Sequence, residues 1–299
     1  MAGRRRIRYS TSSIIFNILS YALVTFITIC CLVPFFLIVT ASFSSDSAIR
    51  FNGYSFLPQE PTLEAYELVF KFPMKVVKAY GVSIYITAIG TAIGLFLITM
   101  TAYVISRKSF KYRNFVSFFF YFTTLFNGGM VCTYIYYIRY LQLKNSFLAL
   151  IFPGMFNVFY LLIMRSFVNA VPSATIESAK IDGAGEFRIF CQIVLPLIPS
   201  GLATIGLFQA LHYWNDWYNA MLYINIPDKY PLQYMLYDIL NRAFALAQMA
   251  AMGGYVAEEM PTYTLKMAMA VVATGPIILV YPFVQRFFIK GITIGSVKG

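Results

Sequence analysis

The sequence predicts an all-α integral membrane protein with six transmembrane helices. Hydrophobic residues make up 59% of the chain, and charged residues make up 12%, which is about half the share of roughly 25% in soluble domains. Six apolar segments are long enough to cross a bilayer, which takes roughly 20 helical residues. Because lipid offers no hydrogen-bond partner to the backbone, these segments are expected to be helices and not isolated strands.

The predicted spans fill most of the chain after a basic N-terminus at residues 1–13, so residues 14–299 are expected to form a single six-span domain. The first apolar run is too long for a secretory signal and lacks a clear cleavage site, so we expect a retained anchor. Kinks are expected at Pro34, Pro153, Pro276 and Pro282. The spans are expected at about Ile14–Phe43, Val82–Ser106, Phe115–Ile138, Phe147–Phe167, Leu197–Tyr223 and Leu265–Ile289.

Basic residues set the expected orientation. The formal net charge of +11 could indicate nucleic-acid binding, but the charges gather at span ends, as in the runs 4–8 and 107–113. That placement fits the negative surface of a cytoplasmic leaflet better, so no nucleic-acid partner is expected. Fourteen basic residues fall on the side of both termini and nine on the other side, where acids offset them. The positive-inside rule therefore predicts that both termini and the loop 172–196 are cytoplasmic.

Two sizeable loops are expected on the outer face. Residues 44–81 should contain a short helix around Thr62–Phe70, and residues 224–264 should contain a helix at Leu232–Met252. These loops could cap a pore or contact an external partner, or they could be solvated connectors.

Several kinds of chemistry are excluded by what the sequence lacks. It contains no G-x-x-x-x-G-K-[ST] motif, so the chain is not expected to hydrolyse ATP. His212 is the only histidine, and the four cysteines show no metal spacing, so no metal site is expected. We therefore predict no catalytic residue, no metal ligand and no cofactor in this chain.

The stretch from Pro172 to Pro196 is polar and lies between two apolar segments. Ser173 is expected to cap the start of a short helix, because its hydroxyl can accept a hydrogen bond from a backbone N–H. Glycines at 183 and 185 are expected to end that helix. A second helical piece is expected from Glu186 to Val194, before the prolines that lead into the next span.

The spacing within this stretch is specific. It reads Glu177-Ser178-Ala179, then Gly183, Ile193 and Leu195-Pro196. This resembles the "EAA" cytoplasmic loop of ABC-importer permeases, which is Glu-Ala-Ala, three residues, Gly, nine residues, Ile, one residue, Leu-Pro. Ser178 is the one departure. The alternative is an ordinary amphipathic connector between spans.

The resemblance implies a role and a set of partners. The helix 174–184 would sit in a cleft of an ATPase, with Glu177, Ala179, Asp182, Gly183 and Ala184 as the ATPase-coupling residues. Glu177 would make polar contact, and Ala179 and Gly183 would permit close packing. The implied partners in the bacterial cell membrane are a second, non-identical six-span permease, an ABC ATPase dimer that binds ATP and Mg, and an extracytoplasmic solute-binding protein.

The fifth predicted span contains a second notable polar segment. Asp216 is the only acid well inside a predicted span, where a carboxylate is costly unless it faces protein or water. Aromatic faces beside amide and carboxylate groups suit sugars, whose C–H faces stack on rings while their hydroxyls need donors and acceptors. The expected substrate-pathway residues are therefore Trp214, Asn215, Asp216 and, in the third span, Asn127. An aromatic belt at the outer interface would explain the fifth-span residues equally well.

Further segments are similar to carbohydrate-importer permeases of the maltose-transporter type. Leu141-Gln142-Leu143-Lys144-Asn145-Ser146 is similar to their Leu-Gly-Leu-x-Asn-Thr stretch, and Trp214-Asn215 matches their Trp-Asn. Gln142 and Lys144 depart from the usual Gly and apolar residue. Three other segments resemble the subgroup of these permeases that imports oligosaccharides in Bacillus-like bacteria. They are Tyr230-Pro231-Leu232-Gln233, Tyr281-Pro282-Phe283 with Gln285, and Val297-Lys298-Gly299.

These features together predict the transmembrane subunit of an ATP-driven carbohydrate importer, with an oligosaccharide as the expected solute. The alternatives are an ABC-importer permease for another solute, such as an amino acid or a polyamine, and a membrane-embedded enzyme that uses His212 and Asp216. The enzyme would require a nucleophile–base pair or a metal set that the sequence does not supply.

Overall fold

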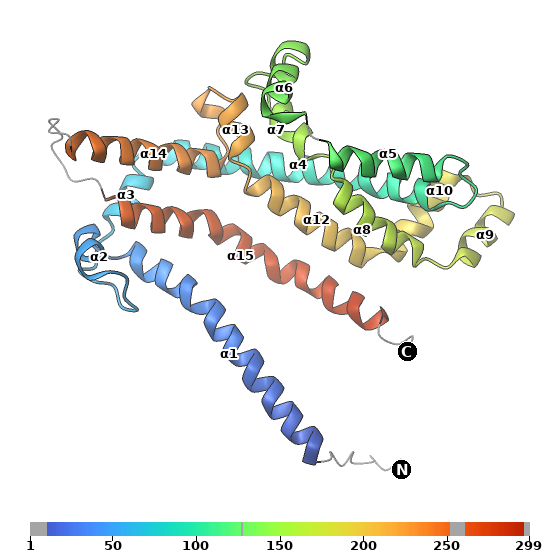
Figure 1. The fold of residues 1–299 in the computed structure, drawn as a ribbon, viewed down its shortest axis with the longest axis horizontal. Coiled ribbons are helices and arrows are strands. Elements are labelled where there is room, and N and C mark those ends of the chain that lie inside the picture. Colours follow the sequence, from blue (N-terminus) through green and yellow to red (C-terminus); the bar gives the residue numbers. More distant parts are fainter. Residues whose placement is uncertain (1–10, 127, 252–260, 296–299) are drawn as a thin grey trace. The chain divides into compact units, whose positions relative to one another are not determined.

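The computed structural model describes residues 11–126, 128–251 and 261–295, and these form helices without any strand (Figure 1). They divide into two compact units. The first contains residues up to 71 together with 242–272, and the second contains 72–241 together with the residues from 273 onward. The predicted basic N-terminus lies outside the described residues, apart from its last few positions.

The first unit contains the long apolar helix α1 and two short helices that follow it. The side chains of α1 are almost all exposed within this chain, as expected for a helix that faces lipid or another protein. Tyr66 from the third helix packs its ring 5.0 Å from that of Phe43, and its hydroxyl lies 2.8 Å from that of Ser42. The elements of this unit are α1 (Thr11–Ser42), α2 (Asp46–Asn52), α3 (Glu64–Val69), and the adjoining ends of α14 (Leu232–Ala251) and α15 (Thr262–Gly295).

Asp46 supplies the N-terminal cap of α15, although more than two hundred residues separate them. One of its carboxylate oxygens accepts from the backbone N–H of Tyr263 at 2.7 Å and from that of Thr264 at 3.0 Å. These are the donors that a helix leaves unsatisfied in its first turn, and a carboxylate also suits the positive end of the helix dipole. The start of α15 is therefore fixed by a residue of the first predicted outer loop.

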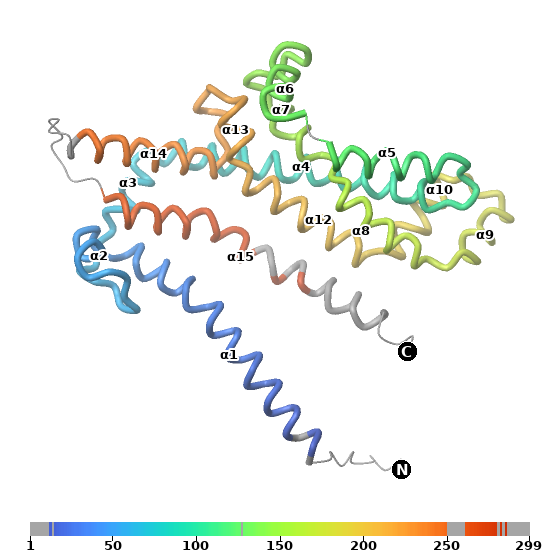
Figure 2. Tube along the Cα trace, viewed as in Figure 1, coloured from blue at the N-terminus to red at the C-terminus, as the bar shows by residue number. Residues whose placement is uncertain are grey.

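The second unit is built around α4 (Pro73–Ser106), which packs along α12 (Pro199–Trp214) and α8 (Val158–Asn169) (Figures 1 and 2). The apolar core of this unit lies between these three helices and the loop that follows α8. Its fully buried members are Ile98, Ala102, Leu161, Met164, Ile189, Val194 and Ile205.

The predicted fourth span is broken near Pro153, where α7 (Leu148–Ile151) passes through a 3-10 turn into α8 at a bend of 56°. The break frees carbonyl groups that helix bonds would otherwise satisfy. The buried amide of Gln209 on α12 donates to the carbonyls of Gly154 and Met155, at 3.3 and 3.2 Å. A neighbouring helix thus satisfies the backbone at the proline break, which is how membrane helices tolerate such breaks.

Other predicted spans are also interrupted. The third is divided into α5 (Arg113–Leu125) and a helical stretch from residue 129 to 140, with Asn127 outside the described residues. The segment 186–197 meets α12 at 86°, and α13 (Tyr218–Tyr223) follows α12 after a short break. The remaining elements are α6 (Gly129–Ile135), a π-helical turn at Tyr136–Tyr140 and a 3-10 turn at Pro227–Lys229.

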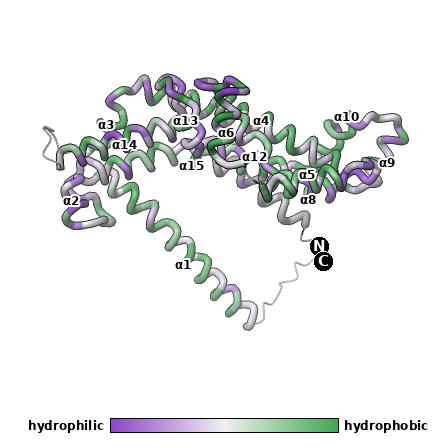
Figure 3. Tube along the Cα trace, turned by 45° about the horizontal axis from the view of Figure 1, so that its top comes forward, coloured by the Kyte–Doolittle hydropathy of each residue, from purple (hydrophilic) through white to green (hydrophobic). Residues whose placement is uncertain are grey.

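Three described helices are long and apolar enough to cross a membrane, and the number rises to six if each bent pair forms one span. The hydropathy colouring makes the contrast visible, because α1 is mostly green while the turn around α9 is largely purple (Figure 3). The predicted outer-loop helices are present as α3 and α14. The second span begins at Pro73, earlier than the predicted Val82.

Candidate functional site

The loop 172–196 forms a separate short helix, α9 (Ser173–Ile181). Ile176 and Ala179, three positions apart, are buried in the core of the second unit, whereas Glu177 and Asp182 are exposed. The predicted N-cap is displaced by one residue, because Pro172 occupies that position and Ser173 makes no capping hydrogen bond. The small side chain of Ala179 therefore packs within this chain, and the exposed face carries the polar residues of the predicted coupling set.

Gly183 ends α9 in a left-handed conformation, with φ of 79°. Its N–H donates to the carbonyl of Lys180, and the N–H of Ala184 donates to the carbonyl of Ala179 at 2.9 Å. These two bonds form a Schellman motif, in which the position after the C-cap favours glycine. The prediction that a glycine ends this helix is confirmed, and the physical reason is the backbone angle. Ala184 packs against the same core as Ala179, which completes the motif's apolar contact.

The loop continues as a second helical stretch, as predicted. It consists of α10 (Glu186–Ile189), a π-helical turn at Phe190–Val194 and α11 (Leu195–Leu197). Its core side is anchored by Ile189 and Phe190, which are both almost fully buried. The two helical pieces are thus held to the same core and are joined through the glycine turn.

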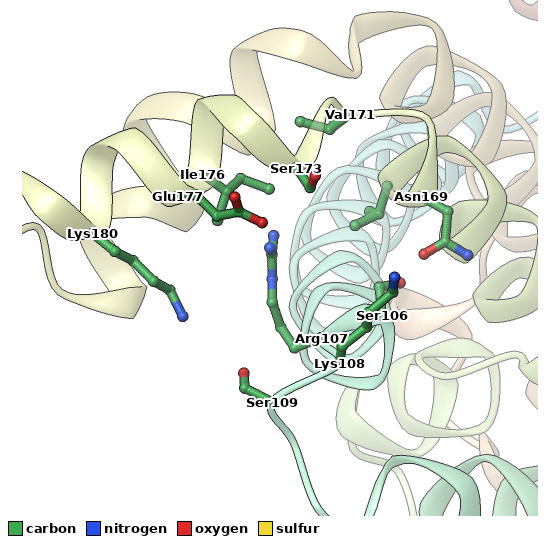
Figure 4. Close-up of a pocket in the computed structure, with 11 residues that line it drawn as sticks. Ser106, Arg107, Lys108, Ser109, Asn169, Val171, Ser173, Ile176, Glu177 and Lys180 are labelled. Carbon is green, nitrogen blue, oxygen red and sulfur yellow. The ribbon is translucent and has the colours of Figure 1, made fainter.

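A pocket of about 350 Å³ lies between α9 and the ends of α4 and α8. In Figure 4, Arg107 rises from the end of α4 toward α9, where Glu177 faces the same space. The other polar residues that line it are Ser106, Lys108, Ser109, Asn169, Ser173 and Lys180. The pocket therefore lies between Glu177, a predicted coupling residue, and the end of α4, the central helix of this unit.

The fifth predicted span forms the second candidate site, a pocket of about 480 Å³ at the end of α12. Its polar lining consists of His212, Asn215 and Asp216, and its aromatic lining includes Tyr160, Phe208, Trp217 and Tyr218. The structure therefore brings two of the predicted pathway residues into one aromatic cavity. Asn127, predicted for the same pathway, lies outside the described residues.

Trp214 does not line this pocket. It is 8% exposed, and its indole N–H donates to the carbonyl of Ala273 at 3.1 Å. Its ring also lies 6.4 Å from that of Tyr80. The other tryptophan, Trp217, occupies the pocket wall and stacks on Tyr237 at 4.4 Å.

The carboxylate of Asp216 already has two local donors. It accepts from the backbone N–H of Asn219 at 3.1 Å and from the Asn219 side-chain amide at 2.7 Å. Asp216 thus holds the first turn of α13 as well as facing the pocket. The amide oxygen of Asn215 accepts from Gln233 at 3.4 Å, which links the pocket to the start of α14.

An aromatic row extends from the pocket along α14. Trp217 stacks on Tyr237, and Tyr234 follows with its ring 6.3 Å from that of Tyr237 and 4.6 Å from that of Tyr230. Burial raises the pKa of Tyr234 above its ordinary value. This row supplies stacking surfaces beside a polar cavity.

Sequence reasoning did not single out several residues that the structure places at these sites. Ile181 on α9 is 87% exposed, and Tyr103, Arg107 and Glu186 meet beside α9. The spacing gave a signal for Ile181, because a position five residues after Ile176 leaves the buried face of a helix. The meeting of Tyr103 with Glu186 joins residues 83 positions apart, so no local pattern marks it.

The long apolar helices are those of a multi-pass membrane protein, and the family and relatives given next show that its membrane is the bacterial inner membrane. Residues 107–294 match the model of the family described as the binding-protein-dependent transport system inner membrane component, and the chain belongs to that family. The matched region contains both the loop 172–196 and the aromatic pocket.

Individual relatives agree with this assignment. The chain is 39% identical over 286 residues to the polygalacturonan/rhamnogalacturonan transport system permease protein YtcP of Bacillus subtilis, covering 95% of this chain and 99% of the relative. It is 39% identical over 270 residues to protein LplC of the same organism, covering 90% of each. Among solved structures, a chain of a bacterial ABC transporter involved in import of the acidic polysaccharide alginate aligns with a TM-score of 0.75 and 28% identity, covering 95% of this chain and 100% of that one.

Proposed function

We propose that this chain is a transmembrane subunit of an ATP-driven oligosaccharide importer, in which it forms half of the translocation pathway and couples that pathway to closure of an ATPase. The observation that carries the coupling role is α9. The spaced loop motif folds into a separately capped helix that is anchored by Ile176 and Ala179 and exposes Glu177 and Asp182.

The exposed face of α9 suits docking to another protein. Ile181 presents a large apolar side chain at 87% exposure, next to the polar Asp182 and Glu177. The basic residues at span ends support a cytoplasmic position for this loop, where an ATPase could reach it.

The proposed assembly contains four kinds of component. This chain pairs with a second, non-identical six-span permease, and both rest on an ABC ATPase dimer fed by an extracytoplasmic solute-binding protein. ATP and Mg²⁺ would be bound by the ATPase subunits, because this sequence has no phosphate-binding loop of its own. Membership of the family supports these partners.

Closure of the ATPase would displace α9 as a rigid element. The end of α8 leads directly into α9, and α4 packs along both α8 and α12, so a displacement of α9 reaches the helix that carries the aromatic pocket. Such rigid-body movement between two packed arrangements is how many transporters alternate the access of a central site.

The pocket and the relatives both support a carbohydrate as the solute. The cavity combines exposed aromatic rings with an amide and a carboxylate, which are the groups that stack on and hydrogen-bond to sugars. Further relatives include an arabinooligosaccharides permease protein, AraQ of Halalkalibacterium halodurans, at 26% identity over 94% of this chain. An oligosaccharide is therefore favoured over an amino acid or a polyamine.

The decisive experiment is to purify the tagged chain from its host membranes in mild detergent and identify what accompanies it. We expect an ABC ATPase and a second permease. Uptake is then measured in vesicles with labelled oligogalacturonides, arabino-oligosaccharides and galacto-oligosaccharides, and with an amino acid and a polyamine as comparison solutes. A chain that purifies alone, even after cross-linking through Glu177, would overturn the proposal, and uptake of only the comparison solutes would overturn the choice of solute.

A further inference from the structure

Glu186, the first residue of α10, is held by two other helices at once. One oxygen of its carboxylate lies 2.5 Å from the ammonium of Lys180, in the last turn of α9. The other oxygen accepts a hydrogen bond of 2.5 Å from the hydroxyl of Tyr103 on α4. Each oxygen therefore serves a different element. Hydrogen bonds to an ionised group are among the stronger polar contacts in proteins.

The α4 end of this arrangement is rigid. Tyr103 is 4% exposed, and its ring packs 5.5 Å from that of Phe190. The guanidinium carbon of Arg107, the residue that directly follows α4, lies 4.2 Å from the centre of the same ring. Because the ring is buried and covered on α4, its hydroxyl is a fixed point to which Glu186 attaches.

The α9 end needs such an attachment. This helix buries only Ile176 and Ala179, and it is joined to α10 through the glycines at 183 and 185, whose backbones lack side-chain support. Apolar contact resists separation but is not directional, so two buried apolar side chains do little to oppose sliding or rotation. The Lys180–Glu186 pair, whose side chains are 40% and 54% exposed, spans the glycine turn and adds a directional contact between α9 and α10.

We propose that Glu186 is a positioning residue that transmits the displacement of α9 to α4. This inference rests on the proposed coupling function and adds a second route besides the direct connection from α8. The bond to Tyr103 carries the movement to α4, while the pair with Lys180 keeps α9 engaged. Without Glu186, only the connection from α8 would carry the displacement of α9 to α4, and α9 could turn about the glycines without moving α10.

The test separates ATP hydrolysis from movement of the pathway and needs no knowledge of the solute. The native cysteines are replaced, and a single cysteine is placed at Tyr218, in the wall of the aromatic pocket. The complete assembly is reconstituted in vesicles. Labelling of that cysteine by a membrane-impermeant maleimide is measured with and without Mg-ATP, in parallel with phosphate release.

Four variants make the comparison specific. Glu186→Ala removes both contacts, Tyr103→Phe removes only the bond to α4, and Glu186→Gln keeps an oxygen for Tyr103 but loses the charge. Arg188→Ala is the control, because Arg188 lies on the same α10 helix and bonds only to Gln192 among the contacts seen there, at 2.9 Å.

In the parent assembly, we expect ATP to change the labelling rate about fivefold or more, the range typical of allosteric coupling. Glu186→Ala and Tyr103→Phe should hydrolyse ATP while losing most of that change. Glu186→Gln should retain more of it than Glu186→Ala, and Arg188→Ala should match the parent. An unchanged response in Glu186→Ala would overturn the inference, as would equal loss of hydrolysis and response in all variants including the control. A parent assembly without any response to ATP would instead contradict the proposed function.

Discussion

The side-chain amide of Gln209 donates to the carbonyl oxygen of Met155 at 3.2 Å, across the break that divides the predicted fourth span. The same amide reaches the carbonyl of Gly154 at 3.3 Å. Gln209 is fully buried on α12. One polar side chain on a neighbouring helix thus compensates the backbone of a broken one.

Replacement of Gln209 by Leu is expected to lower the free energy of unfolding by about 1–3 kcal/mol, because two buried carbonyl groups lose their donor. Thermal unfolding of the purified chain in detergent measures the change. Gln192→Ala serves as the comparison, since Gln192 is exposed and such surface changes usually stay within about 0.5 kcal/mol. Equal stability of the two variants would contradict the assigned role.

Glycines on α4 should respond in opposite directions to the same substitution. A Cβ at Gly94 would overlap the amide of Gln209, so Gly94→Ala should destabilise the chain by about 1–3 kcal/mol. Gly81 lies on the same helix with open space around it, so Gly81→Ala should stabilise it by about 0.5–1 kcal/mol through higher helix propensity. Unfolding temperatures of both variants test this, and a shift of the same sign in both would refute it.

Substitutions at Gly183 and Gly185 distinguish the effect of backbone strain from the effect of added bulk on the proposed docking face. Gly183→Ala should weaken the end of α9 by about 1–2 kcal/mol, because φ is 79° there, while the surrounding space is open. Gly185→Ala, also in open space but with an ordinary φ of −69°, should be nearly neutral. Gly183→Arg adds bulk on the proposed docking face and should abolish uptake while membrane insertion is retained. Normal uptake by Gly183→Arg would remove the support for docking through this turn.

The two tryptophans should have separable effects. Trp217→Ala removes a ring from the pocket wall and should reduce uptake, and the loss of its stacking on Tyr237 should cost about 0.5–1.5 kcal/mol of stability. Trp214→Phe loses the donor to the carbonyl of Ala273 and should cost about 1 kcal/mol of stability. Uptake and unfolding are measured on both variants. The opposite pattern would place the solute at Trp214.

Asp46→Ala should destabilise the chain by about 0.5–2 kcal/mol, the usual cost of removing a helix cap. Ser47→Ala is the matched control, because the hydroxyl of Ser47 lies one residue away and contacts only Ser45 among the side-chain contacts found there. The difference in unfolding temperature between the two variants is the measurement, and identical values would show that α15 does not depend on this cap.

The sequence was sufficient to predict the all-helical class, the separate helix after Pro172, and the helices α3 and α14 within the loops 44–81 and 224–264. Each depends on local signals, namely apolar length, helix-ending glycines and proline boundaries. The predicted coupling residues and the role of Asp216 toward solute stay predictions. The contacts that could not be predicted join residues that are distant in the chain, such as Glu186 with Tyr103 and Trp214 with Ala273.

The turn at 141–146 is another feature that a distant segment determines. Gln142 departs from the family's usual Gly, and its φ is 52°, so the backbone is left-handed where glycine would be unstrained. Asn145, also left-handed at φ of 58°, accepts from the N–H of Asn225 at 2.6 Å and donates to the carbonyl of Tyr223 at 2.9 Å. Contacts to a segment eighty residues away hold this turn in place of a favourable local sequence.

The cap that Asp46 places on α15 also imposes an order on biosynthesis. Ribosomes add about 5–20 residues per second, so a chain must grow for roughly ten to forty seconds between the appearance of Asp46 and that of Tyr263. During that interval, the backbone N–H groups of Tyr263 and Thr264 do not yet exist as donors to this carboxylate. Asp46, which caps the start of α15, is therefore synthesised long before α15 itself. Formation of this cap requires that the segment around Asp46 is already correctly inserted when Tyr263 is added.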